Sequence, residues 1–158
     1  MRENEFTDRV LQVQGRLYRT ACAFLGDGDS AVEAIDEAVY RAFLSLRKLR
    51  EPALFETWLT RILINVCKKE LRRKRRQQPM ETLPEDTEDA FDALPLREAL
   101  GKLPPELRDV MVLRYFSGHT LAETAQALQI LQGTAASRQR RALALLKLEL
   151  SESEEMNT

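Results

Sequence analysis

The chain has 158 residues, of which 44% are apolar and 31% are charged, and its formal net charge is −1. This length allows one domain or two small ones, and the near-neutral balance excludes a polycation as a whole but not opposite charges segregated along the chain. Two isolated cysteines match neither a disulfide framework nor a metal site, and no signal core or membrane-length apolar stretch is present, so we expect a cytoplasmic protein with no membrane insertion of its own.

Two amphipathic helices are predicted at the start of the chain. Apolar residues recur at helical spacing across residues 5–25 and again across 34–46. The intervening "GDGDS" (26–30) contains two glycines and is predicted to be a turn, with Asp29 or Ser30 as the N-cap of the second helix. A calcium loop is the alternative for this turn, but the regular ligand spacing and the closing glutamate are missing.

A third helix is predicted to start near Phe55, after a break at Pro52. Its first half has an apolar stripe that would face a core, and its end, "NVCKKELRRKRR" (65–76), has seven Lys or Arg among twelve residues. Beyond Cys67 the apolar stripe fails, so we expect this end to project beyond the core with charge on nearly all sides. A basic helix end is either a nucleic-acid surface or merely a solvated face.

An acidic segment separates the two halves of the chain. Residues 77–95 hold six Asp or Glu, three Pro and no Lys or Arg. This composition is typical of a flexible or extended linker. The predicted fold is therefore all-α, with two small helical domains at 1–76 and 96–150, the linker between them and a disordered tail at 151–158.

The second half of the chain is predicted to contain a helix-turn-helix. A short helix is predicted around Leu96–Leu103, and Pro104 and Pro105 suit the start of the next one, which stops at Gly118. Thr120 and Glu123 form the capping-box pattern that opens a further helix, and a longer Arg-rich helix follows over 134–150. Two helices joined by a short turn, the second of them basic, indicate DNA binding, although helical hairpins of other function share the pattern.

No set of residues in the sequence converges on catalysis. His119 is the single histidine, and its place between two helices favours capping or solvent exposure over work as a general base. A glycine-rich phosphate loop is also missing from the sequence. We therefore expect no enzyme activity, no catalytic residue, no metal site and no cofactor.

Four segments, in this order, carry a resemblance to a known family. They are "AVEAIDEAVYRAF" (31–43) and "FETWLTRILINVCKKELRRKRR" (55–76) before the linker, and "LPPELRDVMVLRYFSGHTLAETAQAL" (103–128) and "GTAASRQRRALALL" (133–146) after it. Together they are similar to the extracytoplasmic-function sigma factors, two-domain subunits that direct bacterial RNA polymerase to promoters. The resemblance extends over nearly the whole chain.

The resemblance implies that core RNA polymerase and promoter DNA are partners of the protein and that an anti-sigma factor controls it. The first domain would bind the polymerase clamp and the downstream (−10) promoter element, and the second domain the upstream (−35) element. The residues that would face the polymerase clamp are Glu33, Asp36, Glu37 and Arg41. The alternative for these four residues is a solvated face.

DNA contacts are assigned by the same resemblance to the two basic helices. On the third helix, the residues expected to bind DNA are Arg61, Asn65, Lys68, Lys69, Arg72 and Arg73. On the last helix, they are Thr134, Ala136, Ser137, Arg138, Arg140 and Arg141. The side chains of Asn65, Ala136 and Arg140 are expected to face base edges, and the others phosphates.

Two glutamines depart from the pattern of the family. Gln129 stands where a turn glycine is usual, so either this residue adopts a left-handed conformation or the turn changes shape. Gln139 stands where Leu is typical and falls near the inward stripe of the last helix, so its amide needs a partner. Two alternative functions stay open: a polymerase-independent helix-turn-helix regulator, and a degenerate sigma-like adaptor that binds a regulatory protein.

Overall fold

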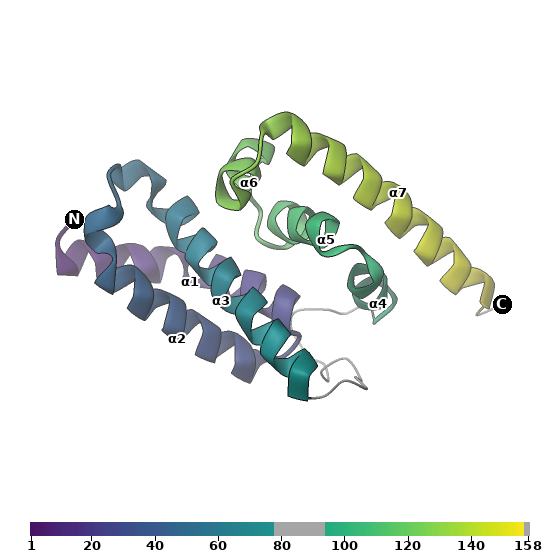
Figure 1. The fold of residues 1–158 in the computed structure, drawn as a ribbon, viewed down its shortest axis with the longest axis horizontal. Helices are drawn as coiled ribbons and strands as arrows, with labels where there is room; N and C mark the ends of the chain where they lie inside the picture. Colours follow the sequence, from purple (N-terminus) through teal and green to yellow (C-terminus); the bar gives the residue numbers. More distant parts are fainter. Residues whose placement is uncertain (78–93, 157–158) are drawn as a thin grey trace. The chain divides into compact units, whose positions relative to one another are not determined.

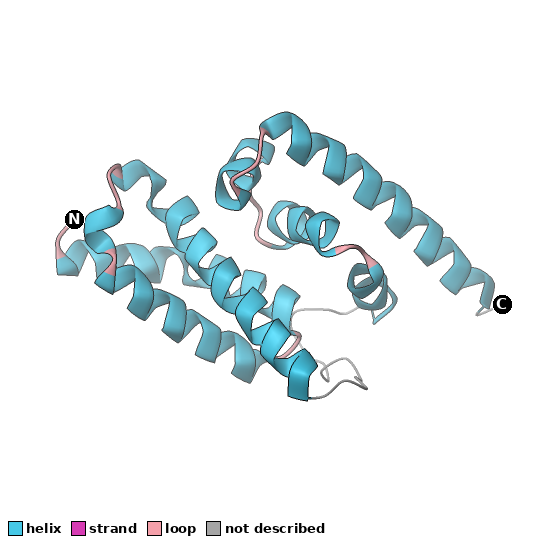
Figure 2. Ribbon diagram, viewed as in Figure 1, coloured by secondary structure: helices cyan, strands magenta, loops and turns pink. Residues whose placement is uncertain are grey.

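The structure, a computed structural model, describes residues 1–77 and 94–156 (Figure 1). Within these ranges the chain forms helices and short helical turns and no strand (Figure 2), which confirms the predicted all-α class. The chain divides into two compact units, Met1–Thr87 and Glu88–Thr158. The predicted linker 77–95 lies outside the described residues except at its two ends, which are helical.

Three long helices make the first unit: α1 (Glu3–Leu25), α2 (Gly28–Leu44) and α3 (Phe55–Gln77). The 3-10 turns η1 (Leu46–Lys48) and η2 (Pro52–Leu54) connect α2 to α3. Each helix packs against the other two. The large side chains at the centre of this core are Phe6, Leu17, Phe24, Leu25, Phe55, Leu59 and Leu63.

Helix α2 contributes only small side chains to this core. Its buried residues are Ala31, Ala34, Ala38 and Ala42. Because an alanine side chain ends at Cβ, the backbone of α2 can approach its neighbours closely while the interior stays well packed. Val32, Tyr40 and Leu44 of α2 lie on the solvent side instead, whereas the partly exposed ring of Phe43 packs against the core residue Phe6, with 5.6 Å between the ring centroids.

The turn between α1 and α2 has a different N-cap from the one predicted. Gly26 ends α1 in a left-handed conformation (φ 86°), and the side chain of Asp27 accepts a hydrogen bond from the backbone N–H of Ser30 at 2.7 Å. Asp29 and Ser30, the predicted caps, lie inside the first turn of α2. Asp27 is the cap because its backbone is extended (φ −136°, ψ 154°), which places the carboxylate beside the free N–H groups of the helix start.

The second unit contains four α-helices: α4 (Leu94–Lys102), α5 (Pro105–Met111), α6 (Leu121–Leu128) and α7 (Gln132–Met156). The π-helical turn η3 (Val112–Phe116) extends α5, and Gly118 (φ 74°) follows it, near the predicted stop. Helices α4, α5 and α6 all pack against α7. One cluster of buried side chains joins three of these helices; it contains Ala99, Leu100, Leu103, Leu107, Met111, Ala142 and Leu146.

Two predictions for this unit are wrong. The tail predicted to be disordered at 151–158 is helical as far as Met156, because a helix that has already formed extends at little further cost and Glu and Met are good helix formers. Residues 157–158 lie outside the described residues. Solvent exposure, one of the two roles predicted for His119, is also wrong, since only 2% of its surface is exposed. Its backbone N–H donates to the carbonyl of Leu113 at 2.9 Å, and its own carbonyl accepts from Arg114 at 2.7 Å.

Candidate nucleic-acid interface

The second half of α3 presents most of the exposed residues predicted to bind DNA in the first unit. Residues three and four apart share one side of a helix, so the line that begins at Arg61 continues through Asn65 to Arg72. Solvent reaches Asn65, Lys69, Arg72 and Arg73 freely, whereas Arg61 and Lys68 are half-buried. Cationic groups open to a phosphate backbone therefore gather toward the C-terminal end of the helix.

A charged groove of about 610 Å³ lies between α2 and α3. The cationic residues on its α3 wall are Lys69, Arg72, Arg73 and Arg76. Its α2 wall contains Glu33, Glu37 and Arg41. The groove thus places three residues predicted to bind DNA beside three of the four predicted to face the polymerase.

Asp36, the fourth residue predicted to face the polymerase, lies apart from the other three. It lines a smaller groove of about 410 Å³ between α1 and α2, together with Tyr18 and Val32. The structure therefore divides the predicted clamp-facing residues between two sides of α2. Sequence spacing did not show this, because which side of α2 turns toward α1 depends on how the three helices pack.

Some of the charged side chains in the α2–α3 groove form ion pairs with one another. Arg73 donates to both carboxylate oxygens of Glu70, from Nε at 3.0 Å and Nη2 at 2.5 Å, and also to Gln77 at 3.1 Å. The hydrogen bonds between Arg73 and Glu70 lower the pKa of Glu70 and raise that of Arg73. Arg41 donates to Glu37 at 2.7 Å. The cations of the groove that take part in no ion pair among the described residues are Lys69, Arg72 and Arg76.

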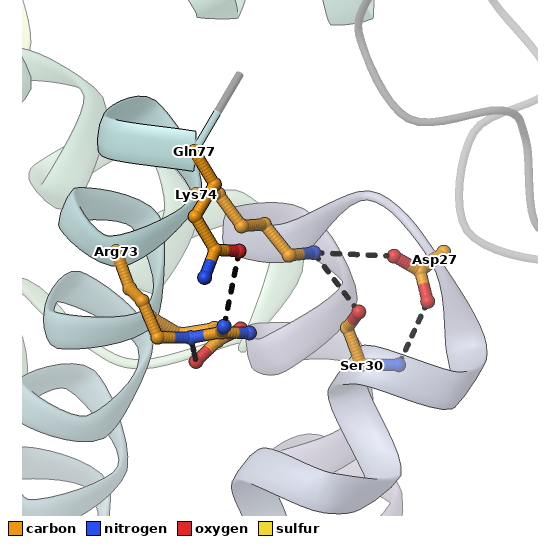
Figure 3. Close-up of polar contacts among 6 residues, drawn as sticks. Asp27, Ser30, Arg73, Lys74 and Gln77 are labelled. Atoms are coloured by element: carbon orange, nitrogen blue, oxygen red, sulfur yellow. Dashed lines mark hydrogen bonds and ion pairs between the residues drawn. The ribbon is translucent and has the colours of Figure 1, made fainter.

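Lys74 joins the basic end of α3 to the start of α2 (Figure 3). Its Nζ donates to Oγ of Ser30 at 2.9 Å and lies 3.6 Å from Oδ2 of Asp27. Burial alone would raise the pKa of Asp27, but hydrogen bonds from Ser30 and the charge of Lys74 together hold it below its usual value. The end of α3 lies beyond the apolar core, as predicted, since no residue of α3 after Cys67 is buried. It nevertheless contacts α2, because the carboxylate that caps α2 attracts Lys74.

In the second unit, α6 and α7 form the predicted helix-turn-helix. Thr120 and Glu123 make the capping box in both directions: Oγ1 of Thr120 accepts from the N–H of Glu123 at 3.1 Å, and Oε1 of Glu123 accepts from the N–H of Thr120 at 2.8 Å. Gln129 ends α6 in a left-handed conformation (φ 58°, ψ 45°). Of the two predicted outcomes, the turn therefore keeps its shape and the glutamine takes the backbone conformation of a glycine.

The residues of α7 predicted to bind DNA differ in exposure. Ser137, Arg140 and Arg141 are exposed, whereas Thr134, Ala136 and Arg138 are half-buried. Nη2 of Arg138 lies 3.9 Å from Oε2 of Glu106, whose side chain is 72% exposed. An ion pair this long and this accessible to water contributes little stability. A phosphate could therefore replace Glu106 at low cost.

Gln139 has the partner that its position demands. Nε of Arg114 donates to the amide oxygen of Gln139 at 2.8 Å, and Nη1 of the same guanidinium donates to the carbonyl of His119 at 2.7 Å. Sequence analysis did not identify Arg114. The one available signal was Gln139 itself, since an inward amide oxygen requires a donor from somewhere in the unit.

The described part of the chain contains neither a candidate metal site nor a candidate membrane-spanning helix. Residues 1–77 and 94–156 contain no cluster of His, Cys, Asp and Glu suited to a metal ion. None of the helices in these ranges combines the length and apolar character that a bilayer span requires. A cationic helix in one unit and a helix-turn-helix in the other are typical of DNA-binding proteins of the transcription-factor class.

Comparison with known proteins narrows this class to one family. The model of "Sigma-70 region 2" matches residues 10–77, and that of "Sigma-70, region 4" matches residues 99–148. The RNA polymerase sigma-E factor of Streptomyces coelicolor is 34% identical, over 92% of this chain and 86% of that protein. The ECF RNA polymerase sigma factor SigM of Mycobacterium tuberculosis is 31% identical, over 83% of this chain and 69% of that protein. The chain belongs to the extracytoplasmic-function (ECF) family of RNA polymerase sigma factors.

A solved structure shows the same fold. The sigma factor RpoE of Bartonella quintana, crystallised with the anti-sigma factor NepR, superposes with a TM-score of 0.74. The match covers 93% of this chain and 97% of that one, at 21% sequence identity. The two proteins therefore share the same fold.

Proposed function

We propose that this protein binds core RNA polymerase and directs it to promoters, acting in the cytoplasm as a sigma factor. The observation that carries the proposal is the presence of both sigma-70 regions, in order, in a chain that matches its sigma-factor relatives over most of their length. The polymerase supplies the chemistry of transcription, so this chain needs no catalytic residue of its own. RpoE was solved with an anti-sigma factor, and we propose a regulator of that kind here too.

The polymerase-binding surface is proposed to include the exposed acidic residues of α2. Glu37→Lys should weaken the complex with core polymerase, because the substitution reverses a charge on the wall of the α2–α3 groove. Asp8→Lys is the matched control, since Asp8 is an exposed carboxylate of α1 that lines neither groove. The measurement is co-elution of each variant with core polymerase at equal helical content. Equal binding by both variants would contradict the assignment.

The two basic helices are proposed to divide their DNA contacts between phosphates and bases. Losing a phosphate contact removes affinity alike for all sequences and lowers the salt dependence by about one ion, whereas losing a base contact relaxes preference at one position by about 1–3 kcal/mol. Arg72→Ala and Arg138→Ala should therefore lower transcription from all cognate promoters alike. Asn65→Ala should relax preference in the downstream element, and Arg140→Ala in the upstream one.

Run-off transcription from a randomised promoter library, with core polymerase and each variant beside the parent protein, tests this division. If Arg72→Ala changes the downstream preference while Asn65→Ala does not, the facing of α3 is the reverse of the one proposed. If the parent protein neither binds core polymerase nor starts transcription on any fragment, the proposed function itself fails. Duplex binding by the parent protein without polymerase would support an independent regulator instead.

A further inference from the structure

Lys74 differs from the two cations that follow it in the basic run. The side chain of Lys74 is only 27% exposed, whereas Arg75 and Arg76 are exposed. Its contacts are internal and lie on another helix, 44 residues away at Ser30. A cation that is occupied inside the protein is not free to neutralise a DNA phosphate. Its role must therefore differ from that of Arg72, which lines the groove and is exposed.

Lys74 is part of a small polar network that links the C-terminal end of α3 to the N-terminal end of α2 (Figure 3). Oδ1 of Asp27 accepts from the backbone N–H of Ser30 at 2.7 Å, and Oδ2 is 3.6 Å from Nζ of Lys74. The hydroxyl of Ser30 accepts from the same Nζ at 2.9 Å. Two contacts, both made by Nζ of Lys74, therefore join the last turns of α3 to the start of α2, and the hydrogen bond between Asp27 and Ser30 holds the two acceptor residues together.

This end of α3 has little else to hold it in place. From Lys68 to Arg76 the helix has seven cations, one carboxylate and a single apolar residue, Leu71, which is half-buried. Like charges three and four residues apart repel one another along a helix. Apolar burial therefore fixes these turns less firmly than it fixes the first half of α3, and the contact of Lys74 with α2 adds a specific restraint.

We propose that Lys74 is a positioning residue, which through Asp27 and Ser30 sets the cationic wall of the α2–α3 groove at a fixed distance from its acidic wall. Ser30 itself lines the groove, and the walls that the contact joins contain Arg72 and Arg76 on one side and Glu33 and Glu37 on the other. The inference rests on the proposed function, in which one wall binds DNA and the other binds polymerase. Lys74 then couples the two surfaces without touching either partner.

Lys74→Met in the full-length protein, assembled with core polymerase, tests this role against Arg75→Met. Both changes remove one positive charge from adjacent residues, and only the first removes the contact to α2. Lys74→Met should lower transcription about fivefold relative to Arg75→Met, as expected for loss of one charge-assisted contact. The dependence of promoter binding on salt should stay that of the parent, whereas Arg72→Ala should lower its slope by about one ion. Lys74→Arg should restore transcription.

Asp27→Asn is a second, independent test. Asn caps a helix as well as Asp does, but it has no negative charge to attract Lys74. This variant should reproduce the loss caused by Lys74→Met, and the double variant should be no worse than either single one. Additive losses, a lowered salt slope in Lys74→Met, or equal losses in Lys74→Met and Arg75→Met would overturn the inference. If Lys74→Met does not fold, Asp27→Asn and Lys74→Arg decide. A parent protein that is inactive with polymerase would instead refute the proposed function.

Discussion

Arg114 connects three parts of the second unit through one side chain. It lies in η3, and its guanidinium donates to the carbonyl of His119, in the loop before α6, and to the amide oxygen of Gln139, in α7. The group also lies over the ring of Tyr115, 5.6 Å from its centroid. A planar guanidinium can make these contacts together because its donors point in fixed, different directions. The orientation of α7 relative to the turn thus depends on a polar contact as well as on apolar packing.

Gln139→Leu should destabilise the protein although Leu is the residue more typical of the family. The substitution leaves Nε of Arg114 without its acceptor in a half-buried place, at a cost of about 1–2 kcal/mol. Gln139→Glu keeps an acceptor at the same position and serves as the control. Denaturant unfolding of both variants beside the parent measures the difference. A Gln139→Leu protein as stable as the parent would show that Arg114 finds another acceptor.

Both cysteines should be inert in the folded protein. Cys22 and Cys67 are fully buried, and burial raises the pKa of the Cys67 thiol to about 12, with further contributions from Cys22 and Glu70. Since the thiolate is the reactive form, almost none is present near neutral pH. A disulfide-exchange reagent such as Ellman's reagent should find no fast thiol in the native protein and both thiols in denaturant. A native thiol that reacts within seconds would contradict this burial.

At the scale of elements, the end of α6 contains a glutamine in a conformation that favours glycine. Gln129→Gly should stabilise the protein by about 0.5–1 kcal/mol, because glycine adopts φ 58° without the strain that a side chain causes. This value is a net gain, since glycine also increases the conformational entropy of the unfolded chain, which favours unfolding. Gln126→Gly, inside the same helix, is the control and should destabilise by about 1 kcal/mol. Thermal unfolding measures both. Destabilisation by Gln129→Gly would mean that the glutamine side chain makes a contact that outweighs its backbone strain.

The start of α2 should make the stability of the protein sensitive to acid. Because the folded-state pKa of Asp27 lies below its ordinary value of 3.8, its contribution is present above that value and is lost as the pH falls through the lowered pKa. Asp27→Asn has no such carboxylate. Melting temperatures of parent and variant, compared from neutral pH down to about pH 3, should therefore converge on acidification. A gap between them that stays constant or widens would contradict the pairing with Lys74.

Sequence patterns located most helices well but could not show how one helix meets another. Apolar spacing predicted α1 and α3 closely, and the Thr120–Glu123 pattern predicted the start of α6, because these signals are local. The partners of Lys74 and Gln139 lie 44 and 25 residues away, so neither could be found by spacing along one helix. The same limit explains the division of the acidic residues of α2 between two grooves. Tertiary packing decided each of these cases.

For the whole molecule, the net charge of −1 conceals a strong separation of charge. The run 65–76 holds seven cations, and the segment 77–95 that follows holds six acidic residues and no cation. A protein with a strong local field need not have a large net charge, and long-range attraction to DNA follows the local field. The sequence therefore indicated a nucleic-acid surface through the distribution of its charges rather than through their sum.

Each unit has its own buried core, so fragments 1–77 and 94–158 should each fold alone. Each should show helical circular dichroism and a cooperative thermal transition. Under the proposed function, a mixture of the two fragments should nevertheless fail to replace the intact chain in transcription at equal concentration. Once one unit of the intact chain is bound, the covalent connection holds the other unit near its own site at an effective concentration of about 1 mM. Separate fragments at micromolar concentration lack this advantage. Run-off transcription with core polymerase and increasing amounts of the mixture measures this dependence. An unfolded fragment would show that the cores are not independent, and a mixture as active as the intact chain would show that the connection contributes nothing to promoter recognition.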